Sequence, residues 1–374
     1  MRVGLGTTMI EPLLNGGRQD GIGVYTAALR RHLPAAGCQV AAFSFPRWGA
    51  DPAPIRIGQA LPQSFEVATV RDLLGPKAHR MHMPVDIFHT TDYRLVRMDC
   101  PQVATLHDAL PIRYPQWCSG RLRGLKNRLQ GIAARKADHV IAVSHYAVDE
   151  LVSCFGVDER RVSVVHNGID DDWQVVPAAA AVQATLAAHG LREGYFLFVG
   201  TLQPRKNVER LIDAWERLPA ATRAARQLVL VGGPGWRCDD TVRRLDAARQ
   251  RGDNIVWLRD LTDGVALRHV YAAAGVFVLP SLYEGFGIPV LEAMGAGVPV
   301  VTSNTSSLPE VSAGAALEVD PLDVGAIAAA MRALADESAL RAHCISAGLA
   351  RAAQLSWRET ARQTAAVYHH VLSR

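Results

Sequence analysis

Hydrophobic residues in this chain form short continuous runs that alternate with longer stretches of helical spacing. Runs rich in Val, Ile and Leu, without polar alternation, are typical of strands buried on both faces of a parallel sheet. Strands are predicted at Arg2–Leu5, Gln39–Phe43, Ile87–Thr90, Gln102–Leu106, His139–Val143, Val162–Val165, Tyr195–Val199, Gln227–Val231, Ile255–Leu258, Val276–Leu279 and Val298–Thr302. Helices are predicted between them at Gly23–Leu33, Arg121–Lys136, His145–Cys154, Val208–Arg217, Asp239–Arg249, Asp263–Ala273 and Pro289–Met294. This alternation predicts an α/β fold with parallel sheets covered by helices on both sides.

The alternation is interrupted once, between Asn167 and Gly190. The turn dipeptide Asn167-Gly168 opens this segment, and an acidic patch and the Ala-rich run VPAAAAVQATLAAHG follow. We interpret the segment as a hinge between two Rossmann-like halves, residues 1–172 and 173–354. A length of 374 residues is typical of two domains.

Composition and charge narrow the class of protein. Hydrophobic residues make up 49% of the chain, enough for a large core, yet no run approaches the roughly 18 residues of a membrane span. The N-terminal MRVGLGTTMI is typical of an opening strand rather than a signal peptide, so we expect a cytoplasmic protein. Six cysteines without a CxxC pair argue against disulfides and structural zinc. A net charge of +4 gives no reason to expect nucleic-acid binding.

The segment Val276–Val301 (VFVLPSLYEGFGIPVLEAMGAGVPVV) offers the clearest candidate site. Its loop follows a buried strand, and Pro289 suits the first turn of the next helix. Ligands of open α/β sheets bind at the carboxyl ends of strands, where this loop lies. Backbone N–H groups of Gly285–Ile288 at the helix N-terminus would attract a diphosphate. Glu284 and Glu292 can accept hydrogen bonds from hydroxyls, although Glu292 could instead serve the helix dipole.

The string Ser281–Glu292 (SLYEGFGIPVLE) resembles the signature of the family-4 retaining glycosyltransferases, which have the GT-B fold. The resemblance implies two Rossmann-like domains facing a central cleft, an acceptor-binding N-terminal domain, and a C-terminal helix within 355–374 that crosses back to it. It also implies that Glu284 approaches the donor sugar and that Glu292 accepts hydrogen bonds from the ribose. The backbone that meets sugar and phosphate would belong to Gly285, Phe286, Gly287 and Ile288.

A second segment, Phe198–Asn207 (FVGTLQPRKN), places two cations in the loop after a strand. Arg205 and Lys206 next to a diphosphate would neutralise charge developing on the leaving group, and Arg can bind phosphate oxygens bidentately. The alternative is a solvated basic loop. The family often has Arg where this chain has Thr201, so one phosphate contact is missing there, and Arg205 is expected to supply it. The donor-binding residues predicted in this segment are Gly200, Thr201, Arg205 and Lys206.

The N-terminal half contains two weaker candidates. Gly16-Gly17 and Gly21-Ile22-Gly23 resemble the family's glycine loop, and Gly23 is therefore expected near the donor phosphate or the acceptor. The fingerprint G-x-G-x-x-G is absent, which disfavours a nicotinamide dehydrogenase. His107 matches a family histidine near the reacting carbon, although local backbone could satisfy it instead.

The segment Ser119–Lys136 (SGRLRGLKNRLQGIAARK) is basic, without an acidic residue, and has Leu and Ile at helical spacing. Such a helix can lie on an anionic membrane, which would place the protein peripherally on the inner face of that membrane, or it can be an ordinary surface helix. Ser144 is expected to be an N-cap of the following helix.

The predicted reaction is hexose transfer from a nucleoside diphosphate sugar to a hydroxyl of a glycan or lipid-linked acceptor, with retention. The strings TLQPRKN and HDALPIRYPQW resemble bacterial mannosyltransferases of surface polysaccharides, which favours GDP-mannose. The base would be recognised by backbone near Arg259–Leu261. We expect no metal, because Asp170–Asp172, the one Asp-x-Asp, falls in the predicted hinge. A UDP-sugar donor, an epimerase or phosphorylase, and an inactive relative remain alternatives.

Overall fold

The computed structural model describes residues 1–15, 20–48, 55–73, 80–118 and 123–374. The chain divides into two compact units. The N-terminal unit comprises Met1–Pro115, Gly120–Asn167 and Trp357–Arg374, and the C-terminal unit comprises Gln116–Ser119 and Gly168–Ser356. The main division therefore falls inside the turn dipeptide Asn167-Gly168, five residues before the predicted boundary at 172.

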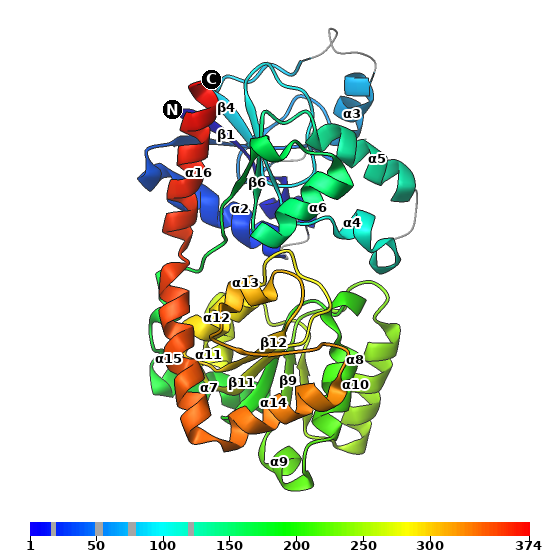
Figure 1. The fold of residues 1–374 in the computed structure, drawn as a ribbon, viewed down its shortest axis with the longest axis vertical. Helices are drawn as coiled ribbons and strands as arrows, with labels where there is room; N and C mark the ends of the chain where they lie inside the picture. Colours follow the sequence, from blue (N-terminus) through cyan, green and yellow to red (C-terminus); the bar gives the residue numbers. More distant parts are fainter. Residues whose placement is uncertain (16–19, 49–54, 74–79, 119–122) are drawn as a thin grey trace. The chain divides into compact units, whose positions relative to one another are not determined.

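The described residues of the N-terminal unit form a seven-stranded parallel sheet (Figure 1). Its order is β3-β2-β1-β4-β5-β6-β7. The strands are β1 (Arg2–Gly6), β2 (Gln39–Ser44), β3 (Gln59–Ala60), β4 (Ile87–Thr90), β5 (Gln102–Leu106), β6 (His139–Ala142) and β7 (Val162–Val164). Every residue of β4, β5 and β6 is buried, as the continuous apolar runs predicted.

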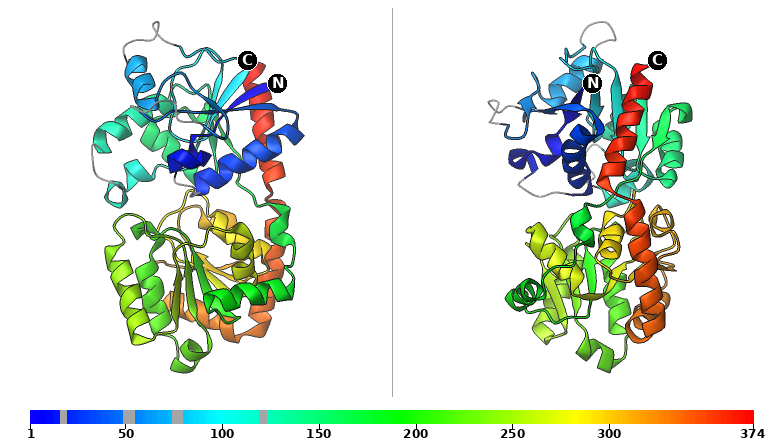
Figure 2. Two further views of the ribbon diagram at one scale, coloured as in Figure 1. Left: turned by 180° about the vertical axis from the view of Figure 1, so that it is seen from behind. Right: turned by 90° about the vertical axis from the view of Figure 1, so that its left-hand side faces the viewer.

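Helices cover this sheet, and one of them comes from the end of the chain. They are α1 (Pro12–Asn15), α2 (Gly21–His32), α3 (Phe65–Leu73), α4 (Leu110–Arg113), α5 (Arg123–Ala134), α6 (His145–Phe155) and α16 (Trp357–Leu372). The last helix, α16, packs against α2 (Figures 1 and 2) and buries Trp357 and Tyr368. The C-terminal helix therefore crosses back to the N-terminal unit, as the GT-B resemblance implied.

The C-terminal unit is built on a six-stranded parallel sheet of order β10-β9-β8-β11-β12-β13. Its strands are β8 (Tyr195–Val199), β9 (Leu228–Val231), β10 (Ile255–Leu258), β11 (Ala274–Leu279), β12 (Val300–Ser303) and β13 (Leu317–Val319). Its helices are α7 (Ala179–His189), α8 (Val208–Glu216), α9 (Ala220–Ala225), α10 (Asp239–Arg251), α11 (Gly264–Ala272), α12 (Ile288–Gly295), α13 (Leu308–Ser312), α14 (Val324–Asp336) and α15 (Ser338–Gln354). Helix α8 packs against α14, and α12 packs against α11 and α15.

The two sheets share one topology. From its own first strand, each runs in the order 3-2-1-4-5-6, and the N-terminal sheet adds a seventh strand at the end. In each sheet the second and third strands are added on one side of the first strand, and the fourth and later strands are added on its other side. A topological switch point therefore lies between β1 and β4, and another lies between β8 and β11. Loops at the carboxyl ends of such strand pairs diverge and leave a crevice for a ligand.

The predicted hinge is wrong over its Ala-rich part. That run forms helix α7 inside the C-terminal unit, with Val182 and Leu186 buried and the helix packed against α11. Alanine has the highest intrinsic helix propensity, so the run itself favours a helix. The short strands β3 and β13 were not predicted either, because two or three residues do not establish a hydrophobic period.

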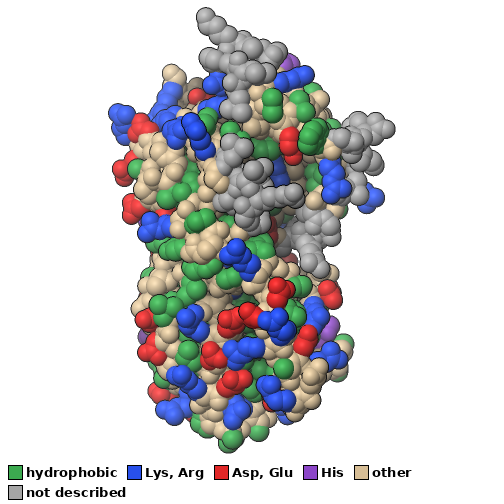
Figure 3. Space-filling model, turned by 90° about the vertical axis from the view of Figure 1, so that its right-hand side faces the viewer, with side chains coloured by type: hydrophobic (Ala, Val, Ile, Leu, Met, Phe, Trp, Pro, Cys, Tyr) green, Lys and Arg blue, Asp and Glu red, His purple; other side chains and the backbone are tan. Residues whose placement is uncertain are grey.

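The surface of the C-terminal unit carries both signs of charge. Figure 3 shows Lys and Arg interspersed with Asp and Glu on this unit. Near α10 they form exposed ion pairs, such as Arg244 with Asp213 at 2.8 Å and Arg259 with Asp246 at 2.7 Å. Across the described part of the chain, no helix is long and apolar enough to cross a membrane.

Candidate active site

At the C-terminal switch point, one glutamate lies between two cations. Arg205 Nη1 donates to Glu284 Oε2 at 2.5 Å, and Lys206 Nζ donates to Glu284 Oε1 at 2.6 Å. The two cations follow β8 and the glutamate follows β11, the two strands that flank the switch point. The structure thus brings together three predicted catalytic residues from two segments that lie far apart in the sequence.

These three groups are largely withdrawn from solvent, which strengthens their electrostatic interactions. Glu284 is 5% exposed and Lys206 is 6% exposed. Burial alone would raise the pKa of Glu284, but Arg205 and Lys206 lower it to about 2. Burial lowers the pKa of the Lys206 ammonium, and the Glu284 carboxylate acts against that shift. Two cations facing one carboxylate leave a net charge of +1, which complements an anion.

Side chains to which the sequence analysis gave no role hold the two loops in place. Asn207, in the left-handed region at φ 58°, donates from Nδ2 to the carbonyls of Pro280 and Pro321 at 2.9 and 2.7 Å. Ser306 Oγ accepts from the backbone N–H of Glu284 at 3.1 Å. Ser307 Oγ hydrogen-bonds to the carbonyl of Glu284 at 2.9 Å. The position of Glu284 is therefore fixed through its backbone as well as its carboxylate.

The loop Gly285–Ile288 leads directly into α12. Gly287 has φ 112°, a left-handed backbone conformation that favours glycine, and a Cβ added there would lie 2.8 Å from Leu308 Cδ2. Gly287 is the N-cap of α12 and supplies no capping side chain. The first turn of α12 therefore presents backbone donors and the positive end of the helix dipole beside Glu284. Phe286 and Ile288 are buried on either side of the glycine.

Glu292 lies in the second turn of α12 and accepts a hydrogen bond from a residue that the sequence analysis did not single out. Tyr271 Oη donates to Glu292 Oε2 at 2.9 Å. Burial raises the pKa of Glu292 to about 7, and the hydrogen bond from Tyr271 acts against this rise. Since the first turn of α12 contains no acidic residue, a helix-dipole role does not account for Glu292.

The other predicted donor-binding positions lie along the same edge of the sheet. Gly200 lies beside Lys206, because a Cβ added at Gly200 would be 3.4 Å from Lys206 Cε. Thr201 is exposed. Arg259 and Leu261 follow β10, the outer strand, and are not among the groups that contact Glu284. The Arg259 guanidinium lies 4.0 Å from the centre of the Trp257 ring and pairs with Asp246. The side chain of Arg259 is thus engaged within the C-terminal unit.

In the N-terminal unit, Gly23 lies in the first turn of α2, which begins at Gly21 rather than at Gly23. Its N–H donates to Asp20 Oδ1 at 2.9 Å, so a carboxylate already caps this helix N-terminus. That arrangement makes the amide of Gly23 a poor phosphate donor. Gly16 and Gly17, the other part of the predicted glycine loop, lie outside the described residues.

His107 follows β5 and is fixed by backbone on one side of its ring. Its Nε2 lies 3.0 Å from the carbonyl oxygen of Thr91, and Tyr25 packs edge-on at 5.0 Å between ring centres. A carbonyl only accepts, so this partner assigns the proton to Nε2 and leaves a lone pair on Nδ1. Burial lowers the pKa of His107, which favours this neutral form. Local backbone therefore satisfies one nitrogen, and Nδ1 has no partner among the described residues.

The basic segment forms α5, and some of its charges serve the fold. Arg135 Nη1 donates to the carbonyl of Phe155 at 2.9 Å, at the end of α6, and Lys136 forms an ion pair with Asp72. Arg128 is exposed, and residues 119–122 lie outside the described chain. Ser144 caps α6 by accepting from the N–H of Ala147 at 3.1 Å, as predicted.

Comparison with known proteins identifies the family. The family model for group 1 glycosyl transferases matches residues 187–351, and that for Glycosyltransferase Family 4 matches residues 19–173. O-antigen chain mannosyltransferase B of Escherichia coli is 35% identical over 286 residues, 75% of this chain and 74% of that protein. Glycogen synthase of Mycobacterium tuberculosis strain H37Rv is 32% identical over 300 residues, 76% of this chain and 68% of that protein.

A solved structure shows the same architecture. The Anabaena protein Alr3699/HepE, in complex with UDP-glucose, superposes with a TM-score of 0.74 at 18% identity and full coverage of both chains. The fold and the sequence matches define a class, the GT-B glycosyltransferases. This chain belongs to the family-4-like, group 1 glycosyltransferases, so the predicted family is confirmed.

Proposed function

We propose that the protein transfers a hexose from a nucleoside diphosphate sugar to a hydroxyl of a glycan or lipid-linked acceptor, with retention of configuration. The observation that carries this proposal is the buried cluster of Arg205, Lys206 and Glu284 at the C-terminal switch point. Its net positive charge suits a diphosphate, and its carboxylate suits sugar hydroxyls.

In this proposal each group has one task toward the donor. Arg205, Lys206 and the first turn of α12 bind the diphosphate. Glu284 accepts hydrogen bonds from hydroxyls of the sugar. Glu292 accepts from the ribose hydroxyls, with Tyr271 holding its carboxylate in place. The backbone at Arg259–Leu261 contacts the base.

The chemical step exchanges one bond at the anomeric carbon for another on the same face. The bond from that carbon to the phosphate oxygen breaks, and the bond to the acceptor oxygen forms. The acceptor proton passes to the departing phosphate oxygen, so no protein nucleophile is needed. Arg205 and Lys206 stabilise the negative charge that grows on the diphosphate, and we therefore expect no requirement for a metal ion.

For the donor we propose GDP-mannose. The similarity to a mannosyltransferase of O-antigen chains supports this choice. A UDP-sugar is the competing candidate, since the structurally similar Anabaena protein was solved with UDP-glucose. A panel of GDP- and UDP-sugars, read by thermal shift, separates the two: a shift with a UDP-sugar and none with GDP-mannose contradicts our choice.

Two further measurements test the reaction class. Proton NMR of the product's anomeric centre should show the configuration of the donor, and inversion would overturn the mechanism. Incubation of donor without acceptor should leave the sugar unchanged, whereas an epimerase would convert it.

We also propose peripheral contact with an anionic membrane through α5, where a lipid-linked acceptor would be presented. The exposed Arg128 supports this contact, whereas Arg135 and Lys136 are engaged within the unit. Co-sedimentation with vesicles of anionic phospholipid should weaken in Arg128→Glu. Equal sedimentation of the two proteins would contradict the contact.

A further inference from the structure

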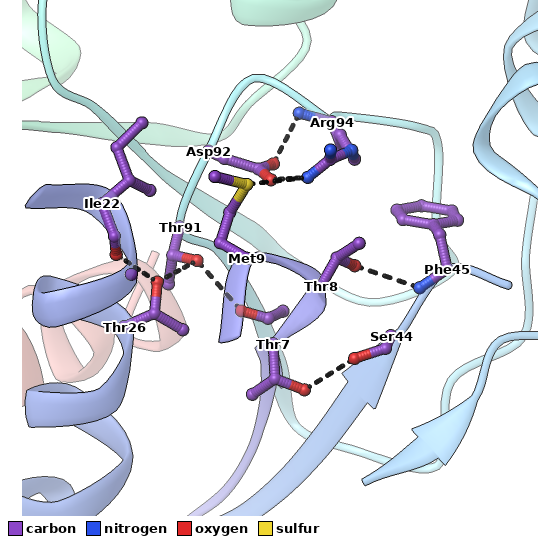
Figure 4. A network of polar contacts seen from close by, with 12 residues as sticks. Thr7, Thr8, Met9, Ile22, Thr26, Ser44, Phe45, Thr91, Asp92 and Arg94 are labelled. Atoms are coloured by element: carbon purple, nitrogen blue, oxygen red, sulfur yellow. Dashed lines mark hydrogen bonds and ion pairs between the residues drawn. The ribbon is translucent and has the colours of Figure 1, made fainter. Parts of the chain in front are cut away.

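The N-terminal switch point has an ionic pair of its own. The loop that begins with Thr7 follows β1, and Asp92 and Arg94 lie in the loop after β4 (Figure 4). Asp92 Oδ1 accepts from the backbone N–H of Arg94 at 2.8 Å, and its other oxygen pairs with Arg94 Nη1. The same Nη1 lies 3.1 Å from the sulfur of Met9. The pair therefore lies where an open α/β sheet binds its ligand.

Hydroxyl groups fix the backbone around this pair. Thr91 Oγ1 donates to the carbonyl of Gly6 at 2.9 Å and accepts from Thr26 Oγ1 at 2.9 Å. Thr7 Oγ1 lies 3.0 Å from Ser44 Oγ. Asp92 is 8% exposed. A buried carboxylate on an anchored loop thus orients the guanidinium of Arg94, as Figure 4 shows.

Arg94 has one edge of its guanidinium available. Its side chain is 35% exposed, and Nε and Nη2 have no hydrogen-bond partner among the described residues. Those two nitrogens form an edge that can donate to two neighbouring acceptor atoms. Both known contacts of the side chain use Nη1 instead.

A second Asp-x-Arg in the same unit shows that this open edge does not follow from the spacing alone. Asp158 Oδ1 accepts from both the backbone N–H and the Nε of Arg160, and Oδ2 accepts from Nη2 at 2.8 Å. There the carboxylate occupies the edge that Arg94 leaves open. That pair precedes β7, at the amino end of the sheet, where ligands of such folds do not bind.

Charge selects the kind of ligand. Asp92 and Arg94 sum to zero, whereas the cluster around Glu284 sums to +1. A neutral pair of donors and acceptors suits sugar hydroxyls better than a phosphate. The pair also adjoins His107, because Thr91 binds the His107 ring through its carbonyl.

We propose that Asp92 and Arg94 form a subsite for the acceptor sugar. The Nε and Nη2 groups of Arg94 donate to two neighbouring hydroxyl oxygens of a neutral glycoside, and Asp92 holds the guanidinium in place. This assignment rests on the proposed function, and it places the acceptor hydroxyl on the same rim as His107.

The test is saturation-transfer NMR with methyl α-D-mannopyranoside as the probe, on the full-length protein. The wild type and Arg160→Met should bind the glycoside, and Arg94→Met should bind it about tenfold more weakly or worse. Arg94→Lys keeps the charge but loses the edge, so it should resemble Arg94→Met. Thermal denaturation of each variant verifies that the fold is intact.

Three results would overturn the subsite: equal binding in Arg94→Met, no glycoside binding by the wild type, or binding of inorganic phosphate in place of the glycoside. Titration of GDP and UDP into the same samples keeps the two proposals apart. If the wild type binds neither GDP nor UDP, the proposed function is wrong. If the wild type binds a nucleoside diphosphate but Arg94→Met binds the glycoside as well as the wild type does, only this subsite is wrong.

Discussion

The two sheets of this protein share a strand order, yet their switch points differ in charge. At the C-terminal switch point, Arg205 and Lys206 surround Glu284 and leave one positive charge. At the N-terminal switch point, Asp92 balances Arg94. In open α/β folds the switch point is the usual place for a ligand, and the loop residues determine which ligand suits it. A diphosphate suits the first site, and a neutral sugar suits the second.

Removal of the Glu284 carboxylate should have the largest effect and should sharpen this contrast. In Glu284→Gln, kcat should fall by about 100- to 1000-fold, because sugar recognition in the transition state is lost. Nucleoside diphosphate affinity should not fall, since the carboxylate that competes for Arg205 and Lys206 is gone. Calorimetric titration of GDP and UDP measures the affinity. A large loss of that affinity would show that Glu284 mainly orients the cations.

Truncation of His107 tests the rim of the N-terminal unit. His107→Ala should lower kcat by about 100-fold, with donor affinity unchanged, if the ring acts on the reacting groups. The ¹⁵N spectrum of histidine-labelled protein, assigned with this variant, should show a proton on Nε2 and none on Nδ1. A proton on Nδ1 of the neutral ring would contradict the contact with the Thr91 carbonyl.

Exchange of Arg205 for lysine tests whether the C-terminal switch point needs a planar guanidinium that can bind two phosphate oxygens at once. Arg205→Lys keeps the charge but loses the bidentate edge, so nucleoside diphosphate binding should weaken about tenfold. Binding of the methyl glycoside should not change, since it depends on Arg94. Arg251→Lys, at an exposed pair with Asp253, is the matched control. An unchanged diphosphate affinity in Arg205→Lys would assign phosphate binding to Lys206 alone.

Glu292 should add a modest pH dependence. Its folded pKa of about 7 lies above the ordinary 4.5, so protonated Glu292 stabilises the fold. That contribution is complete below about pH 4.5 and is lost as pH rises through about 7. The ionised form accepts ribose hydroxyls better, so nucleoside affinity should rise a few-fold between about pH 6 and pH 8. The rise should vanish in Glu292→Gln, and an identical pH profile in that variant would contradict the assignment.

The sequence was sufficient where structure and chemistry depend on neighbouring residues. Apolar runs such as Gln102–Leu106 located strands to within a residue or two, and Glu284 and Arg205-Lys206 stand in contiguous motifs. Prediction from the sequence failed where contacts between residues far apart in the chain determine the structure of the site. Asn207 ends the segment FVGTLQPRKN, but nothing local shows that it joins two loops. Tyr271, which donates to Glu292, has no distinctive neighbours in the sequence. Arg94 pairs with its aspartate through Nη1, whereas Arg160 uses Nε and Nη2. This difference is visible only in the three-dimensional structure.

The most direct test of the central claim is calorimetric titration of GDP-mannose and UDP-glucose into the wild type, Lys206→Met and Arg94→Met. We predict that the wild type binds at least one of these donors, that Lys206→Met binds it about 30-fold more weakly or worse, and that Arg94→Met binds it as the wild type does. Equal affinity in the wild type and Lys206→Met would contradict a donor site at the C-terminal switch point.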